Sequence, residues 1–419
     1  MYWIYSKYTK ENNFYGKSTP IELIKKYGSP LYVYNEKILR NRCKEMKNLV
    51  SYPHFIVNYS AKANSNLKFL KIIKNEGLHV DAMSPGEIFI ELKAGFTPKM
   101  IFYISNNVSA DEMKFAIDAG VNISIDSISQ LELYGKINSG GKVALRFNPG
   151  IGAGHNAKVV TGGKKTKFGI DTAFIPKVKS LLNQYNLKLI GINQHIGSLF
   201  MDSTPYIESV KNILSVAEQF EDLEFIDFGG GFGIPYYKQD YEVRLNIKAL
   251  GEELNEIMHS WANNYGKWVT FKVEPGRYIS AECGVLLGTV NAIKTNSKTR
   301  YVGTDIGFNV IERPVLYESH HDIEIYRESE KASDKIEEVN LVGNICESGD
   351  IIAKGRFLPE IFEDDIIGIL DAGAYGHVMS SNYNSRLRPA EVFIDMDGND
   401  ILTRRRDTLD DLLKVYKIN

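Results

Sequence analysis

Residues 54–83 read HFIVNYSAKANSNLKFLKIIKNEGLHVDAM, and this stretch contains the unit that the first half of the chain repeats. The β-branched and aromatic run His54–Ser60 predicts a strand, because such residues favour the extended backbone of a sheet. Asn66–Glu76 has apolar residues at helical spacing, and His79–Met83 predicts the next strand. Strands separated by helices pair in parallel, since each return to the same edge needs a crossover.

This strand–helix unit recurs between about Pro53 and Arg277 and predicts eight strands in all. Eight such units close into a (β/α)8 barrel of the TIM type. A doubly wound open sheet is the alternative, but no glycine fingerprint follows the first strand. The six remaining predicted strands are Met100–Ile104, Asn122–Asp126, Lys142–Asn148, Lys188–His195, Leu223–Phe228 and Trp268–Glu274. Further helical patterns are Pro85–Ala94, Ala110–Ala119 and Ile207–Phe220.

After Arg277 strands follow one another without long helices, which predicts a C-terminal β domain, either a barrel or a sandwich. We expect the early strand Pro30–Tyr34 to join that domain. The expected division is therefore residues 1–35 with the β domain, 36–280 as the barrel and 281–419 as the β domain. The glycine- and lysine-rich stretch 150–169 predicts a long loop at the barrel mouth. The predicted C-terminal strands are Cys283–Ala292, Arg300–Thr304, Glu338–Val342, Ile366–Leu370 and Ala390–Ile394.

The composition is that of a globular protein rather than a disordered one, with 43% hydrophobic residues and a net charge of -2 over 419 residues. This charge balance argues against nucleic-acid binding. No apolar run approaches the ~20 residues of a membrane span, and Met1–Asn13 does not resemble a signal peptide. Three cysteines cannot form a disulfide framework, so we expect a cytoplasmic location: Cys43, Cys283 and Cys346.

Functional residues of such barrels gather at the carboxyl ends of the strands. Lys62 follows the first predicted strand, Asp81 lies in the second, and His195 ends the sixth, with Ser198 three residues on. The seventh strand runs into Gly229–Gly231 and the eighth into Glu274-Pro275-Gly276-Arg277. Because a glycine loop exposes backbone N–H groups and arginine binds anions, these last two ends predict a phosphate site. Each feature also has a structural reading, such as a solvated lysine, a core histidine or a simple turn.

A lysine opposite a phosphate site predicts Schiff-base chemistry. The lysine either attacks a sugar phosphate, as in an aldolase, or holds pyridoxal 5'-phosphate. Glu274 favours the second reading, because a carboxylate beside the pyridine nitrogen keeps that nitrogen protonated. His195 can then stack on the ring.

These motifs resemble the fold-type III pyridoxal phosphate-dependent decarboxylases, which share an alanine racemase-like barrel, and the resemblance covers nearly the whole chain. Two departures are Leu199, where many relatives have a polar residue, and Tyr59-Ser60, where an aromatic residue is usual closer to the lysine. The matching segments are Ala61–Asn64, Ser84–Glu87, Thr161–Gly163, Lys167–Gly169, His195–Ser198, Gly229–Phe232, Glu274–Arg277, Arg313-Pro314 with Tyr317, Cys346–Asp350 and Asp371–Gly376.

The resemblance implies a role for each matching residue. Lys62 resembles the lysine that holds the cofactor covalently, His195 the ring-stacking histidine and Glu274 the partner of the ring nitrogen. Cys346 resembles the proton donor and Glu347 the residue that reads the distal amino group. In the family both come from the partner subunit of a head-to-tail homodimer. The residues implied around the cofactor are Asp81, Ser198, Gly230, Gly231, Pro275, Gly276, Arg277 and Tyr375, and those implied at the substrate are Arg277, Arg313, Tyr317 and Tyr375.

The implied reaction is the decarboxylation of meso-2,6-diaminopimelate to L-lysine and CO2, with no metal. Its substrate ends in both an ammonium and a carboxylate, which suits Glu347 together with Arg313. The alternatives are a sibling decarboxylase of ornithine, arginine or carboxynorspermidine, an amino-acid racemase, which Glu274 disfavours, and a non-enzymatic pyridoxal phosphate-binding protein. On chemistry alone a lone cysteine such as Cys346 is more often a small buried hydrophobe, and only the Glu-Ser-Gly-Asp sequence after it favours the proton donor.

Overall fold

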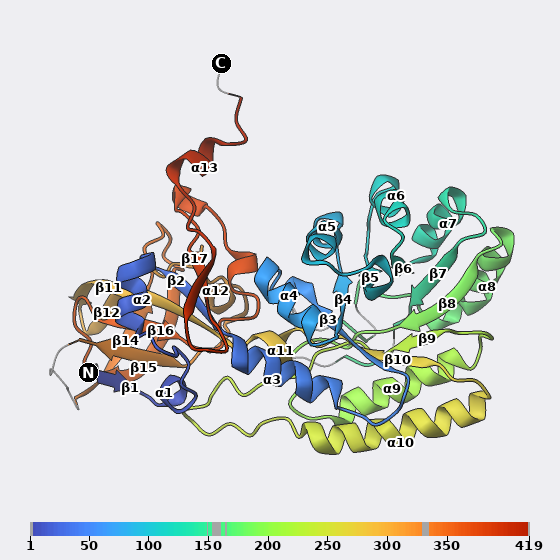
Figure 1. Cartoon of the computed structure of the whole chain (residues 1–419), viewed down its shortest axis with the longest axis horizontal. Helices are drawn as coiled ribbons and strands as arrows, with labels where there is room; N and C mark the ends of the chain where they lie inside the picture. Colours follow the sequence, from blue (N-terminus) through green and yellow to red (C-terminus); the bar gives the residue numbers. More distant parts are fainter. Residues whose placement is uncertain (1–2, 149, 153–160, 164–165, 329–334, 418–419) are drawn as a thin grey trace. The chain divides into compact units, whose positions relative to one another are not determined.

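The computed structural model describes residues 3–148, 150–152, 161–163, 166–328 and 335–417 (Figure 1). Contacts divide the chain into two compact units. The barrel unit consists of residues 40–234 and 244–279, and the β unit consists of residues 1–39, 235–243 and 280–419. Within the described part of the chain, no helix combines the length and the apolar character needed to cross a membrane.

Eight parallel strands close the barrel, in the order β10-β3-β4-β5-β6-β7-β8-β9. Closure is made by β10, which pairs in parallel with both β3 and β9. The strands are short and their residues are largely buried on both faces, as expected for a parallel sheet covered by helices. Their bounds are β3 (Phe55–Ser60), β4 (His79–Ala82), β5 (Ile101–Ile104), β6 (Asn122–Ile125), β7 (Lys142–Arg146), β8 (Lys188–Asn193), β9 (Phe225–Asp227) and β10 (Thr270–Val273).

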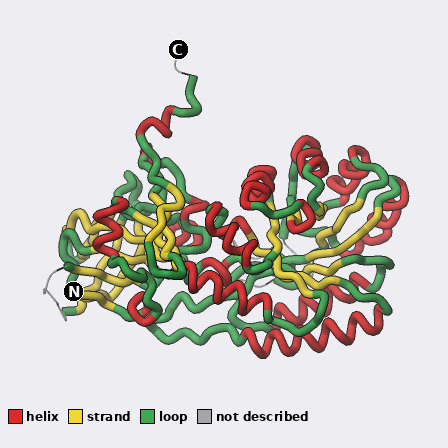
Figure 2. The backbone as a smooth tube through the Cα atoms, viewed as in Figure 1, coloured by secondary structure: helices red, strands yellow, loops and turns green. Residues whose placement is uncertain are grey.

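Helices alternate with these strands and lie outside them, as the red and yellow segments of Figure 2 show. Local signals define where a helix begins and ends. In α5 the side chain of Ser84 accepts a hydrogen bond from the N–H of Glu87, and Gly95 ends the helix with a φ of 97°. The helices are α3 (Glu36–Lys47), α4 (Leu67–Asn75), α5 (Pro85–Ala94), α6 (Ala110–Asp118), α7 (Ile128–Ile137), α8 (Ile175–Gln184), α9 (Thr204–Ala217), α10 (Ile247–Tyr265) and α11 (Arg277–Ser280). Short 3-10 turns are η1 (Ala61–Ala63), η2 (Pro98–Met100) and η4 (Thr172–Phe174).

The β unit is built on a sheet in which the described residues form ten strands. Strand β2, near the N-terminus, pairs antiparallel with β11 and parallel with β17, so the N-terminal segment completes this sheet. Its core includes Leu31, Val33, Val285 and Val392. The strands are β1 (Trp3–Tyr5), β2 (Leu31–Asn35), β11 (Gly284–Asn296), β12 (Thr299–Thr304), β13 (Ile323–Arg327), β14 (Ile336–Val342), β15 (Ile351–Pro359), β16 (Ile366–Ile369), β17 (Ala390–Ile394) and β18 (Asp400–Arg404). Its helices and turns are α1 (Tyr8–Glu11), α2 (Pro20–Tyr27), α12 (Arg313–Tyr317), α13 (Leu409–Leu413), η5 (His377–Met379) and η6 (Tyr383–Ser385).

The structure confirms the (β/α)8 barrel, the β domain and the place of the N-terminal strand in it. All eight barrel strands lie where the sequence predicts them, with ends that differ by up to two residues. Four strands of the β unit are not among those predicted from the sequence: β1, β13, β15 and β18. Much of the predicted loop 150–169 lies outside the described residues.

Candidate active site

Ser60 is the last residue of β3 and lies two positions before Lys62, which is in η1. Its contacts connect three strand ends of the barrel. Its Oγ lies 2.8 Å from Oδ2 of Asp81, in β4, and 3.1 Å from the carbonyl oxygen of Glu274, which follows β10. The backbone N–H of Ser60 also donates to the carbonyl of Pro275. The carboxyl ends of β3, β4 and β10 are thereby fixed around Lys62, as the sequence prediction requires.

Three buried carboxyl groups surround this end of the barrel: Asp81, Asp227 and Glu274. Burial raises the pKa of each of them, and the charge of Lys62 opposes that increase for the pKa of Asp81 and of Glu274. Oε1 of Glu274 makes no hydrogen bond within the described residues. A buried acceptor without a donor is costly. A protonated ring nitrogen would supply that donor, so this carboxylate fits the pyridine ring of pyridoxal phosphate.

His195 and the glycine loop lie at the ends of β8 and β9. The N–H of Gly230 donates to Nδ1 of His195 at 3.1 Å, and burial together with the charges of Lys62 and Arg146 lowers the pKa of His195 well below its usual value. The imidazole is therefore neutral, which suits stacking on a planar ring. An added Cβ at Gly230 would lie 1.9 Å from the carbonyl oxygen of Glu274, and Gly231 has a φ of +107°. Neither position accommodates a side chain, so the loop presents backbone to the site.

Arg277, the first residue of α11, is 6% exposed. Its Nη2 donates to Oγ of Ser198 at 3.0 Å. Gly276 approaches the barrel closely, since a Cβ there would lie 3.0 Å from the Cβ of Ser60. The barrel unit thus brings together predicted residues from β3, β4, β8, β9 and β10. A hydroxyl, a guanidinium and the glycine backbone form a cradle that fits a phosphate group.

The β unit holds the remaining predicted residues. Arg313 begins α12, is 1% exposed and contacts His321 through Nη1 at 2.7 Å, while Tyr317 ends the same helix. Tyr375 lies in the turn after β16 with a φ of +55°. Cys346 and Glu347 are exposed in the connection between β14 and β15.

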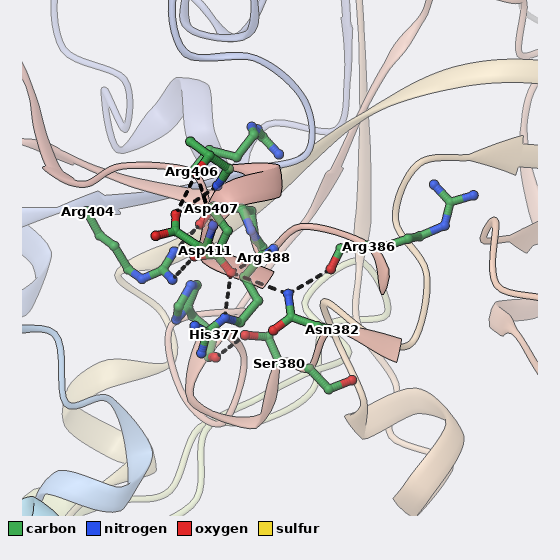
Figure 3. A network of polar contacts seen from close by, with 12 residues as sticks. His377, Ser380, Asn382, Arg386, Arg388, Arg404, Arg406, Asp407 and Asp411 are labelled. Atoms are coloured by element: carbon green, nitrogen blue, oxygen red, sulfur yellow. Dashed lines mark hydrogen bonds and ion pairs between the residues drawn. The ribbon is translucent and has the colours of Figure 1, made fainter. Parts of the chain in front are cut away.

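Two residues of the 380–388 segment hold the Cys346-Glu347 pair. The N–H of Cys346 donates to Oδ1 of Asn384 at 2.8 Å, and the hydroxyl of Tyr383 donates to Glu347. Asp407 anchors this segment. Its carboxylate accepts from Arg388 at 2.8 Å, from Arg404 at 2.6 Å and from Asn382 at 3.4 Å (Figure 3).

Sequence reasoning did not single out Arg146, Tyr383 or Asn384. Arg146 ends β7, and its charge lowers the pKa of both His195 and Glu274. Its place at the end of a barrel strand is the sequence feature that could have identified it. Tyr383 and Asn384 are 36 and 38 residues from their partners, and no sequence pattern relates them.

The family model described as "Pyridoxal-dependent decarboxylase, pyridoxal binding domain" matches residues 36–281. The chain therefore belongs to the pyridoxal-dependent decarboxylases. This match confirms the resemblance seen in the sequence and the prediction of a pyridoxal phosphate cofactor.

Over most of its length the chain is similar to diaminopimelate decarboxylases. Diaminopimelate decarboxylase from Methanothermobacter thermautotrophicus is 40% identical over 409 residues, which cover 95% of this chain and 94% of that protein. The crystal structure of diaminopimelate decarboxylase from Helicobacter pylori with L-lysine matches with a TM-score of 0.86 at 30% identity, over 94% of this chain and 98% of that one. Lysine/ornithine decarboxylase from Vibrio vulnificus with cadaverine shares the fold, with a TM-score of 0.77 at 19% identity, over 89% of this chain and 94% of that one.

Proposed function

We propose that this chain decarboxylates meso-2,6-diaminopimelate to L-lysine and CO2, the last step of lysine biosynthesis, with pyridoxal 5'-phosphate as cofactor. The observation that carries the proposal is the buried Glu274 beside Lys62, with one carboxylate oxygen that no described residue satisfies. The similarity to diaminopimelate decarboxylases over 95% of the chain supports the choice of substrate.

The barrel residues would hold the cofactor as follows. Lys62 would link to it covalently, with Ser60 and Asp81 orienting the strand end from which the lysine projects. His195 would pack against the ring, beside Pro275, while Ser198, Gly230, Gly231, Gly276 and Arg277 would hold the phosphate. Glu274 would keep the ring nitrogen protonated. When bound, the cofactor supplies an electron sink for the electron pair that the departing CO2 leaves behind.

The β-unit residues would read the end of the substrate that does not react. Arg313 and Tyr317, with Arg277, would bind its carboxylate, and Glu347 would bind its ammonium group. Tyr375 would contact both cofactor and substrate. Cys346 would return a proton to the carbon that lost CO2. A site built to bind both charged groups rejects analogues that lack one of them by about 10⁴-fold.

We also propose a homodimer in which Cys346 and Glu347 serve the partner's site. Their exposure in the single chain supports this, because a proton donor in an active site needs to be shielded from water. Mixing Lys62→Ala subunits with Cys346→Ala subunits tests the arrangement. Partial recovery of activity in the mixture is expected, and no recovery in a mixture that forms hybrid dimers would contradict it.

The domain boundaries and the cellular location are part of the same proposal. Residues 36–280 would form the cofactor barrel, while residues 1–35 and 281–419 would form the β domain. The contact-based units support this division, although they also assign residues 235–243 to the β unit. Free thiols at Cys43, Cys283 and Cys346 support a reducing, cytoplasmic location.

Measuring CO2 release from the meso and LL isomers of diaminopimelate, L-lysine, L-ornithine and L-arginine side by side tests the proposed reaction. We expect the meso isomer to be preferred by about 10⁴-fold over substrates that lack the distal carboxylate. Comparable release from ornithine or arginine would favour a sibling decarboxylase. Racemisation without CO2 release would overturn the proposal.

A further inference from the structure

Residues 235–243 leave the barrel shortly after the glycine loop Gly229–Gly231, yet their contacts place them in the β unit. This segment reads PYYKQDYEV. Its side chains contact the same part of the β unit that holds Arg313 and the turn leading to Tyr375.

Tyr236 holds the guanidinium of Arg313 from its face. The Cζ atom of Arg313 lies 4.7 Å from the centroid of the tyrosine ring, and the two side chains are 3% and 1% exposed. A desolvated cation over an aromatic face is a favourable arrangement. The ring also meets His321 edge-on, at 5.4 Å between centroids and an interplanar angle of 82°.

His321 holds the same guanidinium from its edge. Arg313 can only donate, so Nε2 of His321 accepts from Nη1 at 2.7 Å, and Nδ1 donates to the carbonyl of Leu370 at 2.7 Å. A tyrosine face and an imidazole edge therefore confine Arg313 between them. Both of those rings are themselves buried.

Lys238 and Gln239 fix the segment that carries Tyr236. Nζ of Lys238 donates to both carboxylate oxygens of the buried Asp371, at 2.8 and 2.7 Å, and lies 3.4 Å from Glu282. The backbone N–H of Gln239 donates to Oδ2 of Asp322, and its side chain donates to the carbonyl of Ile323, both at 2.9 Å. These contacts tie the segment that carries Tyr236 to Asp322 and Asp371. Asp322 directly follows His321 in the chain, so both groups that hold Arg313 are fixed relative to each other.

We infer that Tyr236 is a specificity-determining positioning residue, which holds Arg313 in the orientation that binds the carboxylate of the substrate's non-reacting end. The inference rests on the proposed function, in which Arg313 binds the carboxylate that L-lysine keeps. Lys238 and Gln239 anchor the segment so that the ring stays over the guanidinium.

Equilibrium binding of L-lysine and of cadaverine to the cofactor-loaded protein tests this, because the two diamines differ only by that carboxylate. Tyr236→Leu is expected to weaken L-lysine binding by about 10- to 30-fold and to leave cadaverine binding unchanged. Tyr236→Phe keeps the aromatic face and should bind L-lysine in preference to cadaverine as the unaltered protein does. In turnover, Tyr236→Leu should raise KM with little change in kcat, because Arg313 contacts a group that does not react.

Tyr241→Leu is the matched control, because Tyr241 lies in the same segment and is 90% exposed. It should bind both diamines as the unaltered protein does. Should Tyr236→Leu fail to fold, Gln239→Ala loosens the segment without emptying the core and should weaken L-lysine binding by about threefold.

The outcomes distinguish a failure of the proposed function from a failure of the positioning role of Tyr236. If the unaltered protein binds L-lysine no better than cadaverine, the role of Arg313 in the proposed function fails. If it prefers L-lysine and Tyr236→Leu retains that preference, the positioning role of Tyr236 is wrong while the proposed function stands. An equal loss in Tyr236→Phe would assign the effect to the hydroxyl and overturn the role of the aromatic face.

Discussion

Replacing Gly230 by alanine tests whether the loop after β9 forms the phosphate end of the site. The added Cβ would lie 1.9 Å from the carbonyl oxygen of Glu274 and 2.7 Å from its carbonyl carbon. Contacts of a Cβ essentially never fall below 3.0 Å, so one of the two backbones must move by about 1 Å. That movement disturbs both the hydrogen bond from the N–H of Gly230 to His195 and the position of Glu274.

Overpacking against rigid backbone costs about 1–3 kcal/mol, which corresponds to a loss of about 5- to 150-fold in affinity for pyridoxal phosphate. Titration of the cofactor-free protein with pyridoxal phosphate, followed by absorbance, measures this loss. Gly86→Ala is the control, because its Cβ would meet only Oγ of Ser84, at 3.6 Å, in the first turn of α5. Cofactor affinity in Gly230→Ala within about threefold of that control would refute the assignment of this loop to the phosphate.

Three further predictions concern the lysine, the cysteine and a buried acid. Lys62→Ala should lose the near-visible absorbance of covalently bound cofactor, and a variant that keeps both this absorbance and full turnover would remove the central assignment. Cys346→Ala should bind cofactor normally but form product about 10²- to 10⁴-fold more slowly, as expected when a proton donor is lost; an unchanged rate would mean that another group delivers the proton. Glu91 is fully buried, neither carboxylate oxygen has a partner among the described residues, and burial with the nearby charges of Asp81 and Glu87 raises its pKa from 4.5 to about 10. The folded state then keeps a proton that the unfolded chain releases, so stability falls as the pH rises between those two values. Glu91→Gln should remove this part of the dependence of stability on pH, measured by thermal unfolding of the cofactor-free protein at about pH 5, 7 and 9. If stability falls with pH equally in the variant and the unaltered protein, the raised pKa of Glu91 is contradicted.

The barrel could be predicted because its signal is local. The strand Ile101–Ile104, for example, is buried along its whole length, and the helix that follows it has its own cap and amphipathic face. Strand β13 gave no such signal, because it contains Glu324 and Arg327. Their charges are satisfied only in three dimensions, where Glu324 accepts from the N–H of Thr9 at 3.2 Å and Arg327 donates to Asp365 at 2.7 Å.

The candidate site divides in the same way. Lys62, His195 and Glu274 could be proposed because a strand end is visible in the sequence and all strand ends of a parallel barrel face one side. Sequence position alone does not reveal that Ser60 connects two other strands, or that Asn384 and Tyr383 hold Cys346 and Glu347. Those contacts depend on which loops meet after folding.

Sequence alone determined the repeating strand–helix unit, the residues at its strand ends and the family to which they point, because hydrophobic periodicity and short motifs act over a few neighbouring residues. Tertiary structure alone decided the state of the buried groups. It surrounds Glu274 with other acids, makes His195 neutral and places Tyr236 over Arg313, 77 positions away in the chain. Burial and the distance between charges set these properties, and both arise only when distant segments pack together.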